Sequence, residues 1–484
     1  MEERGGTWVV KQQRISHITP PSPGKSLSTG IKLSDVLGVG GLRLEASAYN
    51  VAARAAVAAL REAGHSLIPL TGESGMCPEA HNAFRFRRIF VKPERGVAFL
   101  ASSEIIYMRP RAERFISLKQ TPKLSELLVR KWDILISRSG TIGNVGLAGN
   151  TLVNKALSED AIRARATDPE TAGYVTAFLR SRFGRPQIAA ATYGSVIVHI
   201  ELEHLTRVLI PDVSPIRRIA IGSLMREAVE LRDRANNLLD EADRVLHERL
   251  RLPVLKDTSK QFPLVGRVKA SDLNGRFDAS YHNPRVPKVM RKLKASGVPI
   301  STLGDSNVCK EVRAVTKFRK RVYVSHGGIP LMGGKQLFQV DPVDVKGLAK
   351  GAHEKDLKEI GLAENMVTVT CSGTIGRVQI IPRYMGEWTA NQHAHRLVAA
   401  DGMNPGYLYA WLASAYGQLL VTRQSYGSVI FEVDREMIGS IAVPMPEADV
   451  RNEVGNLVLE ANKLRDEAWR KEQDAIQQVN ALAD

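Results

Sequence analysis

The chain has 484 residues, 44% of them hydrophobic, which is enough for two or more domains with ordinary cores. Its formal net charge of +16 favours a polyanionic partner, nucleic acid first, with an acidic protein or an anionic membrane surface as the alternative. No stretch approaches the roughly 20 apolar residues of a membrane span, and the N-terminus lacks the apolar core of a signal peptide. Three cysteines without metal-ligand spacing are best explained as reduced thiols, so we expect a cytoplasmic protein.

The sequence contains a long internal repeat. The pentapeptide Ser-Gly-Thr-Ile-Gly occupies residues 139–143 and 372–376, and Tyr-Gly-Ser-Val-Ile occupies residues 193–197 and 426–430. Both pairs are separated by the same distance along the chain, and a period this long is not that of a solenoid. We therefore predict a duplicated domain and an approximate internal twofold axis.

The repeat divides the chain into segments. Residues 1–42 form a Pro/Gly/Ser-rich N-terminal extension that has no repeat partner and is expected to be partly extended. Each repeat starts with a helical stretch and continues in short strands and Gly-rich turns, which predicts an α/β fold of the mixed α+β kind. The remaining segments are a first repeat domain at 43–212, a long helix at 213–252, a linker at 253–275, a second repeat domain at 276–445 and a second long helix at 446–484.

Both long helices carry a heptad pattern in which alanine occupies one seam position throughout, so that two backbones can approach closely. The seam residues are Leu224, Ala228, Leu231, Ala235, Leu238 and Ala242 in the first helix, and Leu457, Ala461, Leu464, Ala468 and Ala475 in the second. We predict that the helices pack on each other as an antiparallel coiled coil; the alternative is that each packs on its own domain. Lys471 and Gln478 interrupt the second seam, so the final turns are expected either to splay or to contact another protein.

The two Ser-Gly-Thr-Ile-Gly sequences follow short apolar segments, 134–136 and 367–369, which are expected to be buried strands. A tight turn after a strand exposes backbone N–H groups and two short hydroxyls, which can hydrogen-bond phosphate oxygens. The alternative is a plain turn whose hydroxyls bond the local backbone while Ile142 and Ile375 enter the core. The sequence leaves these two roles open.

Basic residues gather at matching places in the two repeats. They are Arg85, Arg87, Arg88, Lys92 and Arg95 in the first, and Arg313, Lys317, Arg319, Lys320 and Arg321 in the second. Phenylalanine and tyrosine are interleaved with them, which predicts strands with one basic and one apolar face. Arginine can bind guanine through two hydrogen bonds whereas lysine more often contacts phosphate, so the clusters favour DNA over a solvated charged surface.

The candidate DNA contacts combine these clusters with the repeated motifs. They are Arg85, Arg87, Arg88, Lys92, Arg138, Ser139, Gly140, Thr141 and Tyr193 in the first repeat, and Arg319, Lys320, Arg321, Ser372, Gly373, Thr374 and Tyr426 in the second.

Sequence features that would indicate an enzyme are missing. The chain has no P-loop and no Asn-Pro-Pro-Tyr or Asp-Pro-Pro-Tyr segment of the kind that amino-methyltransferases use. No histidine recurs at a matching place in both repeats, so a hydrolase based on Ser139 or Ser372 is a weaker alternative, and no metal ligand set is evident. We expect no catalytic residue, metal or cofactor in this chain, and a basic RNA-binding scaffold is a further alternative.

The order of these motifs resembles that of the specificity subunit of type I restriction–modification systems. The resemblance covers roughly residues 43–482: a strand into Ser-Gly-Thr-Ile-Gly, then Tyr-Gly-Ser, then Leu209-Ile210-Pro211 leading into a long helix, all duplicated. It implies two target-recognition domains that each bind half of a split double-stranded DNA site, separated by an antiparallel pair of helices. It also implies two methyltransferase subunits as partners, which would carry the cofactor AdoMet, and a separate motor-nuclease subunit for cleavage and phage defence.

The chain departs from the family at the entry into each long helix. The family often has Pro-Leu-Pro-Pro followed by Glu-Gln, whereas this chain has Pro211-Asp212-Val213-Ser214-Pro215 and Pro444-Met445-Pro446-Glu447. This divergence affects the assignment of the partner subunits more than the assignment of DNA binding. A related defence complex that recruits a different methyltransferase or effector is therefore the main alternative.

Overall fold

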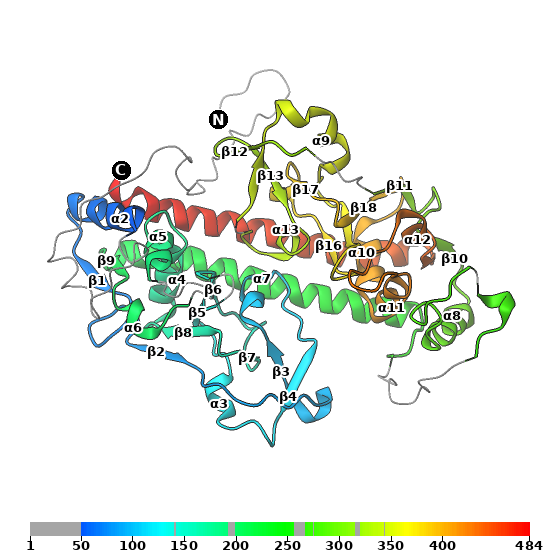
Figure 1. The fold of residues 1–484 in the computed structure, drawn as a ribbon, viewed down its shortest axis with the longest axis horizontal. Helices are drawn as coiled ribbons and strands as arrows, with labels where there is room; N and C mark the ends of the chain where they lie inside the picture. The colour runs from blue at the N-terminus through cyan, green and yellow to red at the C-terminus, as the bar shows by residue number, and fades with distance from the viewer. Residues whose placement is uncertain are drawn as a thin grey trace.

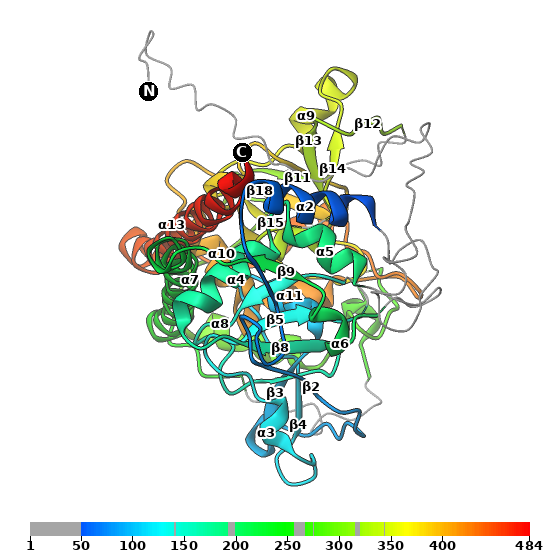
Figure 2. The ribbon, with the colours of Figure 1, turned by 90° about the vertical axis from the view of Figure 1, so that its left-hand side faces the viewer.

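The structure is a computed structural model with two long helices at its centre. It describes residues 50–139, 142–191, 199–255, 267–273, 275–314, 320–342 and 344–484. Helices α7 (Pro215–Arg249) and α13 (Ala448–Asn480) run side by side in opposite directions, and the rest of the chain is arranged around them (Figure 1). In the end-on view, the helix pair lies toward the left, and strands of one half extend upward while strands of the other half extend downward (Figure 2).

The half before α7 combines two sheets and a strand pair with short helices. A four-stranded antiparallel sheet has the order β2-β8-β5-β6, a three-stranded sheet the order β4-β3-β7, and β1 pairs with β9. The strands are β1 (Leu67–Pro69), β2 (Glu79–Asn82), β3 (Gly96–Leu100), β4 (Arg114–Ser117), β5 (Ile134–Ser137), β6 (Val145–Leu147), β7 (Ala156–Leu157), β8 (Ala161–Arg165) and β9 (Leu209–Pro211). The helices are α2 (Val51–Glu62), α3 (Leu124–Leu127), α4 (Pro169–Leu179), α5 (Gly184–Ala190) and α6 (Leu202–Leu205).

The half before α13 has a four-stranded sheet of order β11-β18-β15-β16, a second of order β12-β14-β13-β17, and the pair β10-β19. The strands are β10 (Ile300–Thr302), β11 (Cys309–Arg313), β12 (Tyr323–Val324), β13 (Ile329–Met332), β14 (Lys346–Leu348), β15 (Val367–Thr370), β16 (Val378–Ile380), β17 (Thr389–Ala390), β18 (Ala394–Ala399) and β19 (Ala442–Pro444). The helices are α8 (Arg285–Ala295), α9 (Glu354–Ile360), α10 (Pro405–Ala413), α11 (Ala415–Arg423) and α12 (Arg435–Gly439).

The strand pairing in the central sheet of the first half recurs in the second half between residues at equivalent positions of the sequence repeat. Ile134 on β5 lies opposite Ala164 on β8, and the equivalent residues of the second half, Val367 on β15 and Leu397 on β18, also lie opposite each other. All four residues are buried, so each sheet forms part of a core. The expected apolar segments before Ser-Gly-Thr-Ile-Gly are thus buried strands, β5 and β15.

Ion pairs between the long helices fix their antiparallel direction. Arg249 at the end of α7 bonds Glu453 near the start of α13, and Glu227, which precedes the middle of α7, accepts from Lys471, which follows the middle of α13, each at 2.8 Å. Beside this second pair, Arg232 bonds the buried Glu472. The alanines of the predicted seam are all at most 1% exposed, namely Ala228, Ala235, Ala242, Ala461, Ala468 and Ala475.

The buried face of each helix is broader than a heptad seam because each helix also packs on the surrounding sheets and helices. The start of α7 lies in the core of the first half, through Ile221 and Met225, and its later part lies in the core of the second half. Leu231 and Leu464 are buried, whereas Leu224, Leu238 and Leu457 are only partly buried against these cores. Packing between the helices and packing on the domains, considered as alternatives from sequence, therefore occur together.

The last turns of α13 do not splay. Ala475, Ile476 and Val479 are buried in the core of the first half. Lys471 interrupts the apolar pattern but bonds Glu227 across the helix pair, and Gln478 faces solvent. The interruption therefore marks the place where α13 passes from its partner helix to the first half.

Two glycine pairs bring shorter helices against the long ones. A Cβ on Gly173 in α4 would lie 2.3 Å from the carbonyl oxygen of Gly222 in α7, and a Cβ on Gly406 in α10 would lie 2.2 Å from that of Gly455 in α13. Only glycine allows so close an approach. The next residue in each short helix is a buried tyrosine whose hydroxyl donates to a proline carbonyl just before the long helix, at 2.7 Å in both halves.

A buried arginine ties together three backbone segments in each half. Arg163 donates to the carbonyls of Leu127, Leu157 and Ala161, and Arg396 donates to those of Ile360, Ala390 and Ala394. Both arginines are 0% exposed. Burial lowers the pKa of each guanidinium to about 10, so both remain charged at neutral pH.

Replacement of Arg396 by methionine is expected to lower the free energy of unfolding by about 3 kcal/mol, because three buried carbonyls lose their donor. Arg234→Met, on the exposed side of α7, is the matched control and should change stability by no more than about 0.5 kcal/mol. Urea unfolding followed by circular dichroism measures both. Equal stabilities of the two variants would contradict a structural role for Arg396.

Candidate nucleic-acid interface

In each half, the start of the Ser-Gly-Thr-Ile-Gly turn lies beside a segment that follows Tyr-Gly-Ser, although the two are far apart in sequence. Ser139 forms an antiparallel bridge with His199, and Ser372 forms a similar bridge with Glu432. The segments that follow the Tyr-Gly-Ser sequences are thereby paired with the turns. Gly140, Thr141 and Tyr193, which were predicted to contact DNA, lie outside the described residues.

The basic segment of each half lies close to the same turn. Arg88 donates to both carboxylate oxygens of Glu159 at 2.8 Å, and Arg321, its equivalent in the second repeat, donates to Oε1 of Gln392 at 2.8 Å. The next residue in each half is bonded to the turn: Asp160 accepts through its carbonyl from the backbone N–H of Arg138, and His393 accepts in the same way from Cys371.

The structure thus brings the basic segment, the Ser-Gly-Thr-Ile-Gly turn and the residues next to Tyr-Gly-Ser together in each half. We call the two groups the first loop site (Arg88, Ser139, Glu159, Asp160, His199) and the second loop site (Arg321, Ser372, Gln392, His393, Glu432).

The residues around Arg85 and Arg87 do not form the predicted strand. β2 ends at Asn82, and residues 83–89 have no regular secondary structure. Their phenylalanines pack instead on the second sheet of the first half, since the ring of Phe86 meets Phe99 edge-on at 6.5 Å. The alternation of exposed basic and partly buried aromatic residues is present, but side-chain packing rather than a hydrogen-bonded ladder maintains it.

The exposed cations of the interface are Arg85, Arg87 and Lys92 near the first loop site and Lys320 near the second; Arg319 lies outside the described residues. Arg88 is less available because Glu159 holds its guanidinium, which also lies 5.2 Å from the ring centre of Phe99. Arg138 is 13% exposed, bonds Glu201 and donates from Nε to the Ile200 carbonyl at 3.1 Å. Its position therefore favours a structural role over the predicted contact with DNA.

Both roles considered for the Ser-Gly-Thr-Ile-Gly turns have support in the structure. Ile142 and Ile375 pack against the cores, and the hydroxyl of Ser139 donates to Asp160 at 2.5 Å. In the second turn, Gly373 and Thr374 are exposed. Gly373 has a φ of +74°, which favours glycine, and its N–H donates to the carbonyl of Phe431 at 3.1 Å. The exposed turn is thus locked to the loop beside it.

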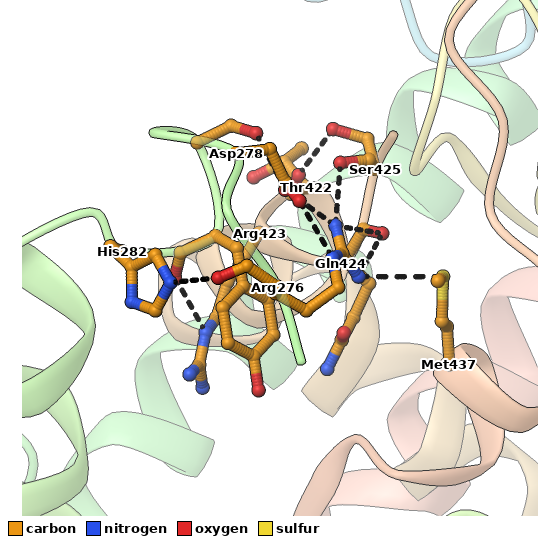
Figure 3. Close-up of polar contacts among 10 residues, drawn as sticks. Arg276, Asp278, His282, Thr422, Arg423, Gln424, Ser425 and Met437 are labelled. Atoms are coloured by element: carbon orange, nitrogen blue, oxygen red, sulfur yellow. Dashed lines mark hydrogen bonds and ion pairs between the residues drawn. The ribbon is translucent and has the colours of Figure 1, made fainter. Parts of the chain in front are cut away.

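A cluster around Arg276 anchors the base of that loop (Figure 3). Arg276 bonds both carboxylate oxygens of Asp278, at 2.8 and 2.6 Å, and donates to the Ser425 carbonyl at 3.2 Å. These hydrogen bonds from Arg276 lower the pKa of the Asp278 carboxyl. The ring of Tyr281 lies beneath two guanidinium groups, Arg276 at 4.7 Å and Arg423 at 4.1 Å.

The sequence pattern did not predict that this cluster supports the loop. Arg276-Phe277-Asp278 has the counterpart Arg43-Leu44-Glu45, so a basic and an acidic residue recur two apart in both repeats. That recurrence marked the start of each repeat. It could also have indicated an ion pair, which in the second half fixes the segment just before Tyr426.

A buried histidine supports the other side of the same loop. His395 is 4% exposed, and its Nε2 lies 2.8 Å from the carbonyl oxygen of Val433. Burial lowers the pKa of His395 below its ordinary value, so the imidazole is neutral at neutral pH.

The stability of the protein is therefore expected to decrease as the pH falls through the usual histidine pKa of about 6.5. Below that pH the unfolded chain binds a proton that the folded chain resists, so acid favours unfolding. Urea unfolding between about pH 7.5 and pH 5.5 measures the effect. His395→Gln, which keeps an N–H donor without titrating, should show a smaller loss of stability over this range, and an equal loss would assign the effect to other groups.

Among the described residues, no group of three or more His, Cys, Asp or Glu side chains could hold a metal ion. The hydroxyl of Ser139 faces a carboxylate rather than an imidazole base, which is not the arrangement of a serine hydrolase. No helix in the described ranges is both long and apolar enough to cross a bilayer.

No family model and no curated protein matches the sequence. Among solved structures, the S subunit of a type I restriction–modification system from M. genitalium matches with 13% identity, 84% coverage of this chain, 92% coverage of that chain and a TM-score of 0.34. The HsdS subunit from Thermoanaerobacter tengcongensis matches with 13% identity, coverages of 85% and 97%, and a TM-score of 0.27. Similarity at these scores is too distant to assign a function.

Proposed function

We propose that this chain is a non-catalytic subunit that recognises a specific sequence of double-stranded DNA. The observation that carries the proposal is the convergence of the same three segments in both halves. In each half, a basic segment with an exposed cation meets the hydroxyl-bearing turn and the residues next to Tyr-Gly-Ser. Cations and short hydroxyls suit phosphate oxygens, and arginine also suits the edges of bases. The net charge of +16 favours the same partner.

The target is proposed to be bipartite, with one short half-site for each half of the chain. The two halves share this framework but differ in side chains at and near the loop sites: Arg87 corresponds to Lys320, and Asp160 corresponds to His393. Such differences suit two different half-sites. The antiparallel helices, acting as a coiled coil, would set the distance between them, since a helix of 35 residues such as α7 spans about 50 Å.

The proposed partners are two methyltransferase subunits, with AdoMet bound to them rather than to this chain, and a motor-nuclease subunit for restriction. The motif order that resembles type I specificity subunits supports this assignment. A related defence complex with a different effector would use the same DNA-binding architecture.

Selection from a random pool of duplexes by the full chain is expected to enrich two short defined blocks separated by a spacer of variable sequence. Affinity for the selected duplex should fall steeply with salt, because each neutralised phosphate adds about −0.9 to the log–log slope. Fluorescence anisotropy at several salt concentrations measures the slope. A slope near zero, or tighter binding of RNA than of duplex DNA, would refute the proposal.

Substitution of one exposed cation in each half tests the bipartite arrangement. Arg87→Gln should relax or weaken binding at one half-site and Lys320→Gln at the other, with a cost of about 1–3 kcal/mol for a lost base contact. A lost phosphate contact would instead weaken all sequences alike. Lys463→Gln, on the exposed side of α13, is the matched control. An equal effect of Arg87→Gln on both half-sites would contradict two separate recognition domains.

A further inference from the structure

We propose that the loop after Tyr426 inserts apolar side chains between stacked bases of the bound duplex. The inference rests on the proposed function and adds the kind of contact that the second half makes with DNA. The side chains concerned are Val429, Ile430 and Phe431, which we call the apolar tip.

The apolar tip is unusually exposed for its composition. Val429, Ile430 and Phe431 are 91%, 61% and 46% exposed, and they are consecutive in sequence. Burial of such side chains against a partner is favourable because it removes apolar surface from water. Adjacent exposed apolar side chains of this kind commonly mark a binding surface.

The backbone of the loop is stiff. Tyr426 and Glu432 exchange both backbone hydrogen bonds, at 2.9 and 2.8 Å, so the residues between them form a closed turn. Gly427 has a φ of +110°, and a Cβ there would lie 2.3 Å from the carbonyl oxygen of Ile430. Only glycine fits this position, and the turn therefore presents the tip in one defined conformation.

The base of the loop is held from two directions. Arg276 bonds the Ser425 carbonyl on one side, and the buried His395 contacts the Val433 carbonyl on the other (Figure 3 shows the first contact). Gly373 of the neighbouring turn donates to the Phe431 carbonyl. A tip fixed in this way loses little conformational freedom on binding, which favours insertion into a tightly packed partner.

The position of the tip favours DNA as that partner. The tip adjoins the second loop site, near which Thr374 and Lys320 are exposed and suited to phosphate. DNA-binding proteins that place apolar residues between base steps unstack them and bend the duplex. The sequence Tyr-Gly-Ser-Val-Ile occurs in both repeats, so the first half carries the same apolar residues at the matching place in its sequence.

The test compares three variants of the full chain on the selected duplex, with 2-aminopurine in place of adenine at successive positions. Val429→Ser with Ile430→Ser removes the two most exposed side chains of the apolar tip, and Val429→Leu with Ile430→Leu keeps the tip apolar. Ile216→Ser with Ile219→Ser is the matched control, because these two residues are 83% and 53% exposed on the first turns of α7.

Wild-type protein, the leucine variant and the control are expected to raise 2-aminopurine fluorescence at one base step in the half-site that Lys320→Gln affects. The serine variant should abolish this rise and weaken binding about tenfold or more, the scale of losing the burial of an apolar side chain. Its salt slope should stay unchanged, since no phosphate contact is removed.

We call the proposed insertion of the apolar tip between bases the wedge. Unchanged affinity and fluorescence in the serine variant would overturn the wedge while leaving DNA recognition intact. The wedge is also overturned if wild-type protein binds with no rise in fluorescence at any position, which would leave the tip to a protein partner. Failure of wild-type protein to bind duplex DNA would overturn the wedge and the proposed function together.

Discussion

The antiparallel contact between α7 and α13 is the constraint on which the rest of the molecule depends. Alanine along the shared seam lets the two backbones approach, and charged pairs such as Arg232–Glu472 fix their direction. Each helix then leaves one core and enters the other, so both halves include a segment of each helix. The relative placement of the two halves is therefore part of hydrophobic packing rather than the property of a flexible linker.

Close packing also positions the shorter elements within each half. Glycine pairs allow α4 to pack closely on α7 and α10 on α13. A tyrosine hydroxyl donates to the carbonyl of the strand before each long helix, and a buried arginine donates to three backbone carbonyls in each half. These interactions recur at equivalent positions of the two repeats and form a common framework. The side chains that face outward at the loop sites differ between the halves, and this combination suits a protein whose two halves share a fold and differ in what they bind.

Some features of the site followed from sequence and others did not. The repeat predicted the positions of β5, β15 and both long helices, because burial imposes a strong apolar period on strands and helices. The strand expected around Arg87 is absent, since alternation of apolar and polar residues does not by itself provide a partner strand. Arg138 was predicted to contact DNA, and the structure shows that its guanidinium donates to Glu201, which lies far along the chain. Pairing of this kind cannot be seen in a local pattern.

Repetition in the sequence alone predicted two related halves, two long helices and a set of shared turns, because these are local patterns that recur at one distance. The tertiary structure was needed to show that the basic segment, the Ser-Gly-Thr-Ile-Gly turn and the Tyr-Gly-Ser neighbourhood meet at one place. It also decided that Arg276 supports the loop at Tyr426 and that the end of α13 belongs to the core of the first half. The reason is physical: local propensity and apolar period act over a few residues, whereas these contacts join segments that only the packing of the two cores brings together.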